Sequence, residues 1–174
     1  MIMLQTEMGG LKNFIAEIDE FAGVISLLSS DRLFLEPMTF RYLEETTLSI
    51  EVDYKDNRIQ EIIFSYYKHE FEGFPLSDLD VQFGCPLVVI PEKKSIVKHM
   101  LYWNLDFGTK AEIHVGKHFV DIRLESGKSI SKIYRDGVLD IFIHDGSIIG
   151  FRVNDISLSD LSIVKERLQI NQNN

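Results

Sequence analysis

Two Asp-Gly dipeptides, at positions 136–137 and 145–146, separate three runs of β-branched and aromatic residues near the end of the chain. An Asp-Gly pair in this setting favours the tight turn that joins neighbouring antiparallel strands. The pattern therefore predicts consecutive strands over 129–134, 138–144 and 147–153. Connections this short exclude a parallel arrangement of these strands, because parallel neighbours need a long crossover connection.

Two further hairpins follow from the alternation of apolar and polar residues. The first covers 47–67 with its turn at 56–57, and the second turns at 116–117. Residues 95–104 fit either a strand or a helix, and their β-rich flanks favour a strand. Gly150 lies inside the last predicted strand and indicates a β-bulge or a close approach of another backbone segment.

Two segments repeat apolar residues at spacings of three and four, which is typical of an amphipathic helix. The first covers 11–29 and contains Gly23, which weakens a helix at that point. The second covers 157–170, where Ser157 followed by Asp160 favours the start of a helix.

These elements predict a single α+β domain over residues 1–174. A chain of 174 residues with 45% hydrophobic residues suits one domain with one core. We expect a mainly antiparallel sheet of about seven strands, built from hairpins over 32–153. An N-terminal amphipathic helix over 11–29 and a C-terminal one over 157–170 flank this sheet.

The net charge is −9, and it is unevenly distributed. Residues 1–80 hold 16 acids and 6 bases, a net charge of −10, whereas residues 81–174 have a net charge of +1. Negative charge repels phosphate backbones and anionic membrane surfaces, so we expect no nucleic acid and no membrane as partners. An acidic face would instead attract a basic protein, although the acids could equally serve solubility alone.

The common motifs of phosphate cradles, serine hydrolases and zinc enzymes do not occur in the sequence. We therefore expect no catalytic residue and no cofactor. Cys85 is the single cysteine and has apolar neighbours, which favours a buried structural thiol in a reducing compartment. The first residues lack the basic segment of a secretory signal, and the chain is therefore expected in the cytoplasm.

Carboxylates occur in closely spaced pairs in the acidic half. Glu51 and Asp53 lie two residues apart on a predicted strand and so share one face. Such a pair could act in general acid–base catalysis if one member were buried, but a polar strand face favours ionised surface groups. Tyrosines lie close to these acids, and aromatic residues are common in protein interfaces. The candidate partner-binding residues are Glu44, Glu45, Glu51, Asp53, Tyr54, Asp56, Tyr66, Tyr67, Glu70 and Glu72.

The histidines offer an alternative site. His114 and His118 flank the predicted turn at 116–117 and could face each other, with Asp121 or Glu112 as a third zinc ligand. Isolated histidines on half-exposed strands are more often solvated, so we predict no metal. A pocket on the sheet for a small ligand or an enzymatic reaction would use His114, His118, His144 and Asp140.

In general character the chain resembles the immunity proteins of bacterial contact-dependent and polymorphic toxin systems. The resemblance rests on the small acidic chain, the lone Cys85 and the missing catalytic motifs. It implies a non-enzymatic protein that neutralises a basic, nuclease-like toxin domain by covering its active site with an acidic face. A third possibility is an assembly subunit that associates through exposed strand edges.

Overall fold

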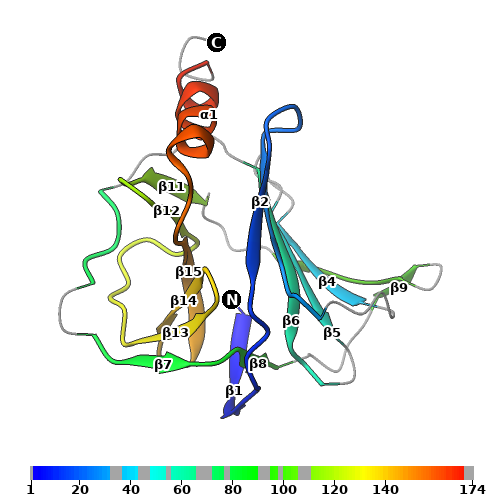
Figure 1. Ribbon diagram of the computed structural model, residues 1–174. Coiled ribbons are helices and arrows are strands. Elements are labelled where there is room, and N and C mark those ends of the chain that lie inside the picture. Colours follow the sequence, from blue (N-terminus) through cyan, green and yellow to red (C-terminus); the bar gives the residue numbers. More distant parts are fainter. Residues whose placement is uncertain are drawn as a thin grey trace.

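The computed structural model describes residues 2–31, 37–42, 48–53, 56–65, 72–76, 79–89, 95–97, 100–105 and 111–170. These residues form mostly β-strands in two sheets, together with one helix (Figure 1).

The first sheet contains eight strands, and six of them form a continuous path. In spatial order these six are β11 (Glu112–Val115), β12 (Val120–Arg123), β15 (Ser147–Val153), β14 (Leu139–His144), β13 (Lys132–Asp136) and β7 (Val81–Phe83). The first strand of the chain, β1 (Ile2–Met8), pairs antiparallel with β15 and with β8 (Pro86–Val88). The pair of β13 with β7 is parallel, and the other pairs are antiparallel.

The second sheet contains seven strands. In spatial order they are β2 (Ile15–Asp19), β3 (Val24–Leu28), β6 (Ile59–Ser65), β5 (Leu48–Asp53), β4 (Pro37–Tyr42), β10 (Met100–Leu105) and β9 (Ser95–Val97). The pair of β4 with β10 is parallel, and the others are antiparallel.

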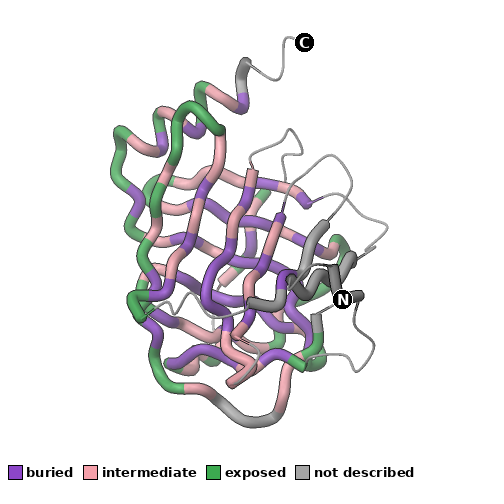
Figure 2. The backbone as a smooth tube through the Cα atoms, turned by 90° about the vertical axis from the view of Figure 1, so that its right-hand side faces the viewer, coloured by how far each residue is buried: buried purple, intermediate pink, exposed green. Residues whose placement is uncertain are grey.

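One cluster of buried apolar residues contains side chains from both sheets. It includes Ile50 and Ile62 of the second sheet and Ile122 and Phe151 of the first. The helix α1 (Leu158–Ile170) adds residues such as Leu161 to the same cluster. In Figure 2 buried residues lie along the strands that cross the middle of the molecule, and exposed ones lie mainly at turns. The two sheets and the helix therefore share one core.

The predicted helix over 11–29 is wrong, because this segment forms the β2–β3 hairpin. Asp19 accepts hydrogen bonds from the backbone of Phe21 and Ala22, and Gly23 has a φ of 65°. This turn chemistry reverses the chain where a helix would continue. The apolar residues 25 and 27, two positions apart, are then buried on one side of β3.

The prediction of about seven strands in one sheet is also wrong for the described residues, which form fifteen strands in two sheets. Local patterns identify hairpins, whereas β1 pairs with β8 and β15, and β10 pairs with β4, all of which lie far away in the sequence. Two such contacts, β4 with β10 and β7 with β13, are parallel. The mainly antiparallel character and the C-terminal helix are confirmed.

Several other local predictions are confirmed, although the strand predicted over 129–134 is β13, which covers Lys132–Asp136. The hairpin within 47–67 is β5–β6, the turn at 116–117 joins β11 to β12, and 95–104 holds strands. Ser157 Oγ accepts a hydrogen bond from the backbone of Asp160 at 3.1 Å, which caps α1. The β14–β15 register shifts between the pairs Phe142–Gly150 and Ile143–Ile148, and an added Cβ at Gly150 would lie 2.5 Å from the carbonyl oxygen of Ile122.

Candidate functional site

Strand β5 directs its two carboxylates away from the core. Its buried residues are 48, 50 and 52, while Glu51 and Asp53 are half-buried on the opposite face. Glu51 lies opposite Glu61 of β6 in the strand register. The predicted shared face of Glu51 and Asp53 is therefore confirmed, and Glu61 lies beside it.

The same outer face continues onto β2 and β3. Ala16 and Ile18 of β2 pack against the core, so the alternate residues Glu17 and Asp19 are exposed on the outer side. We call the outer surface of β2, β3, β5 and β6 the acidic face. It carries Glu17, Asp19, Glu51 and Asp53, with the buried Glu61 between the strands, and these four strands contain no lysine or arginine.

The structure separates two predicted partner-binding residues from the acidic face. Asp56 lies in the β5–β6 turn, where its carboxylate is 3.2 Å from Arg58 Nε and accepts a hydrogen bond from the Arg58 backbone. Glu72 is exposed on the segment 72–76, which packs on the first sheet. Six other candidates lie outside the described residues: Glu44, Glu45, Tyr54, Tyr66, Tyr67 and Glu70.

Sequence reasoning missed Glu17, Asp19 and Glu61 as members of this face. The helix predicted over 11–29 hid the first two, because helical spacing distributes neighbouring acids around an axis. The signal was present in the alternation of Ala16 and Ile18 with acids, followed by the turn that ends at Gly23.

The outer face of the first sheet carries a row of charges that neutralise one another. Asp121, Arg152, Asp140 and Arg135 lie opposite one another on β12, β15, β14 and β13. Arg152 Nε and Nη2 donate to the Asp121 carboxylate at 2.6 and 2.8 Å. Arg135 binds Asp140 in the same two-bond geometry at 2.6 and 2.8 Å. Both aspartates are buried, and the charge of each is compensated by the arginine that contacts it directly.

The segment 72–76 covers part of this row. The backbone N–H of Phe74 donates to Asp121 at 3.0 Å, and its ring lies 4.5 Å from that of Phe142. An added Cβ at Gly73 would lie 2.8 Å from the His114 ring, which shows how closely this segment approaches. The Arg152 guanidinium lies 3.9 Å from the Phe119 ring centroid. These contacts pack the charged row against apolar side chains.

The alternative site built on histidines does not come together. His114 and Asp140 lie on β11 and β14, with β12 and β15 between them, which places them about 14 Å apart across the sheet. His118 is exposed after the β11–β12 turn, and His144 Nδ1 lies 2.8 Å from the Ser129 carbonyl oxygen. Glu112, the possible zinc ligand, is ion-paired with Arg123. Within the described part of the chain, no three His, Cys, Asp or Glu side chains form a metal-binding group.

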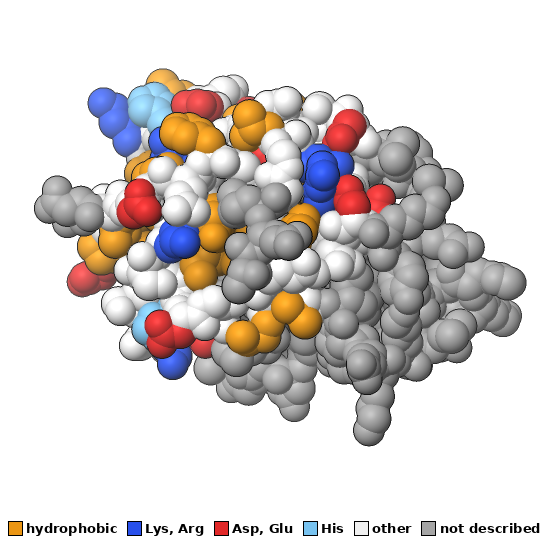
Figure 3. All heavy atoms as spheres, turned by 90° about the horizontal axis from the view of Figure 1, so that it is seen from below, with side chains coloured by type: hydrophobic (Ala, Val, Ile, Leu, Met, Phe, Trp, Pro, Cys, Tyr) orange, Lys and Arg blue, Asp and Glu red, His pale blue; other side chains and the backbone are white. Residues whose placement is uncertain are grey.

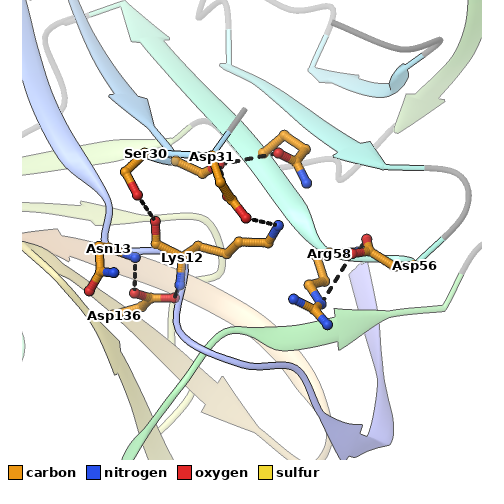
Figure 4. A network of polar contacts seen from close by, with 9 residues as sticks. Lys12, Asn13, Ser30, Asp31, Asp56, Arg58 and Asp136 are labelled. Atoms are coloured by element: carbon orange, nitrogen blue, oxygen red, sulfur yellow. Dashed lines mark hydrogen bonds and ion pairs between the residues drawn. The ribbon is translucent and has the colours of Figure 1, made fainter. Parts of the chain in front are cut away.

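A polar network joins the two sheets around Lys12 (Figure 4). The backbone N–H groups of Lys12 and Asn13 each donate to the Asp136 carboxylate at 2.6 Å. The buried Lys12 side chain reaches Asp31, with 2.9 Å between Nζ and Oδ2. This bond holds the pKa of Asp31 below its usual value, whereas burial raises the pKa of Asp136. Through these contacts the network connects the two sheets.

Two further features limit the chemistry of the described residues. Burial raises the pKa of the Cys85 thiol to about 12, which makes the thiol a poor nucleophile. The predicted burial of Cys85 is confirmed.

Seen from below, the described acidic, basic and apolar side chains are interspersed (Figure 3). Among the described helical residues, no span is long and apolar enough to cross a membrane.

Comparison with known proteins gives no matching family model and no matching curated protein.

Proposed function

We propose that this chain is a non-enzymatic, cytoplasmic protein-binding protein whose acidic face covers a basic protein. One observation carries the proposal. The four strands of the acidic face present Glu17, Asp19, Glu51 and Asp53 at exposed or half-buried positions and contain no lysine or arginine. A surface of one sign attracts a partner of the opposite sign and speeds the encounter between them.

The partner that fits this face best is a basic toxin domain of the nuclease-like class. A nuclease binds a phosphate backbone with lysine and arginine, so its active site presents the charges that carboxylates attract. Covering that site would block it by charge and by shape. The chain would then act as an immunity protein. The candidates from the sequence that lie outside the described residues, such as Tyr66 and Tyr67, would supply aromatic contacts around the acids.

The alternative of a small-ligand or enzymatic site has weaker support. It requires His114, His118, His144 and Asp140 to converge, and the described structure places them on different strands and a turn. Asp140 is also bound by Arg135.

The test combines capture of a partner with charge reversal. Tagged protein is used to isolate partners from its native cells at low and high salt, and the captured protein is then purified for binding kinetics. We expect one basic protein in stoichiometric amount. Reversing two acids, in Glu51→Lys/Asp53→Lys, should reduce its association rate about tenfold or more at low salt.

The control is Glu125→Lys, in the segment that follows β12 of the first sheet. This substitution changes the charge by the same amount as each single substitution in the acidic face. This variant should bind at nearly the wild-type rate. Equal rates for the reversed acidic face and wild type at low salt would overturn the proposal, provided that both variants keep their native circular dichroism.

A further inference from the structure

Strand β2 forms one border of the second sheet (Figure 1). It pairs with β3, and none of the described strands pairs with its other edge. Alternate backbone N–H and C=O groups of a border strand point away from the sheet and can receive another strand. β2 has five residues, compared with three in β7 at the border of the first sheet. It therefore offers a longer hydrogen-bonding edge than β7.

Apolar side chains are exposed along this edge. Leu11, Ile15 and Phe21 are 55%, 50% and 87% exposed, and they make up three of the seven large hydrophobic residues exposed in the described part of the chain. They lie before, on and just after β2. Exposed apolar groups gathered on one short segment indicate an interaction surface.

The core is also incompletely covered at this edge. Ala16 and Ile18 pack against the core cluster, but both are only half-buried. The equivalent inner residues of β3, Ile25 and Leu27, are fully buried. At the two ends of β2, the Phe14 carbonyl oxygen accepts a hydrogen bond from the Val138 N–H at 3.2 Å, and the Glu20 carbonyl oxygen accepts one from Arg167 Nη2 at 2.6 Å. A strand added beside β2 would lie between these two contacts, where it would cover Ala16 and Ile18 and extend the sheet.

The charge of β2 selects the kind of strand. Glu17 is exposed at the centre of the strand, between Ile15 and Asp19 on the outer face. If a second copy paired antiparallel about this centre, Glu17 would face Glu17, and like charges directly opposite each other destabilise a sheet. A strand with lysine or arginine at these positions gains an attraction instead. The edge therefore disfavours self-association in this register and favours a basic partner.

We propose that β2 binds an extended basic segment of the partner protein as an additional strand of the second sheet. This segment alternates basic residues, which face Glu17 and Asp19, with apolar residues, which cover Ala16 and Ile18. The inference rests on the proposed function and specifies it, because it names the edge and the partner conformation. Backbone hydrogen bonds supply binding, and the alternating side chains supply specificity.

The experiment uses a nine-residue peptide of alternating lysine and valine as the probe. Its binding to the full chain is followed by NMR, with hydrogen exchange of the β2 amides as the structural readout. Two control peptides carry N-methyl groups on one or the other alternate set of backbone amides. A peptide strand pairs with β2 through only one set, so one control peptide should lose binding and the other should keep it.

We expect the unmodified peptide to bind and to slow the exchange of amides within Ile15–Asp19. The variant Glu17→Lys should weaken its binding about three- to tenfold, because one attraction becomes a repulsion. Glu125→Lys is the matched charge control and should bind like wild type.

Binding that is equally strong for both N-methylated peptides, with unchanged exchange in β2, would overturn the edge inference. If that binding is also weakened by salt and by Glu51→Lys, the acidic face still attracts basic segments and the proposed function stands. No binding of any peptide at low salt also overturns the edge inference. The proposed function is then decided by the captured partner.

Discussion

Arg152 neutralises a buried carboxylate, and its replacement by methionine tests whether that role is essential. Arg152 donates to Asp121 through Nε and Nη2 at 2.6 and 2.8 Å, and Asp121 is fully buried. Methionine keeps an unbranched apolar side chain and removes the charge. Removing one partner of a buried ion pair costs about 3–5 kcal/mol, because the remaining charge is uncompensated. For a domain of this size, that loss lowers Tm by about 6–20 °C.

The control is Arg135→Met. Arg135 binds the equally buried Asp140 with the same two-bond geometry, but its side chain is 40% exposed, compared with 11% for Arg152. Water can reach the space that Arg135 vacates, so we expect a smaller loss of about 1–2 kcal/mol. Urea unfolding followed by circular dichroism measures both losses, and unchanged m-values confirm that the unfolded states are comparable.

A double variant separates charge from packing. In Asp121→Asn/Arg152→Met the buried charge is absent, and the asparagine oxygen can still accept the Phe74 N–H that Asp121 accepts at 3.0 Å. The double variant should therefore be more stable than Arg152→Met alone. Equal losses for Arg152→Met and Arg135→Met, or a double variant no more stable than the single one, would refute this reasoning.

Three further predictions concern backbone fit, pH and thiol reactivity. Gly137→Ala should lower the free energy of unfolding by about 2–3 kcal/mol more than Gly146→Ala. Both glycines have positive φ, but an added Cβ at Gly137 would lie 2.4 Å from the Phe14 carbonyl oxygen. An added Cβ at Gly146 would have no other atom within 4 Å. Equal losses of unfolding free energy for the two variants in urea would contradict this prediction. Burial raises the pKa of Asp136 in the folded state, so the Asp136 carboxyl group binds a proton more tightly in the folded protein than in the unfolded chain. The stability of wild type relative to Asp136→Asn should therefore be greatest below the pKa that Asp136 has in the unfolded chain, and it should fall as pH rises through the pKa of Asp136 in the folded protein. If the difference in unfolding free energy between the two proteins, measured in urea, does not change with pH, this prediction is wrong. Burial raises the pKa of Cys85 to about 12, so a thiol reagent at pH 8 should label it only as fast as the chain unfolds, and labelling should accelerate in urea.

The candidate site was only partly predictable. The shared face of Glu51 and Asp53 follows from the two-residue period of a strand, which depends on local geometry alone. Glu17 entered this face only when 11–29 proved to be a hairpin. Its apolar residues satisfy helical spacing and strand alternation at once, and packing of Ile25 and Leu27 into the core decides between the two.

The sequence by itself determined the hairpins and the start of the helix, because each depends on a few neighbouring residues. Asp-Gly at 136–137 and 145–146 and Ser157 before α1 adopt their turns and cap through local backbone preferences and hydrogen bonds. Only the tertiary structure decided that there are two sheets and which distant strands meet in them. The pairing of β4 with β10, and the row that places Asp121 beside Arg152, depend on how the apolar faces of both sheets pack into one core. That packing joins residues far apart in the chain, and no local pattern encodes their register.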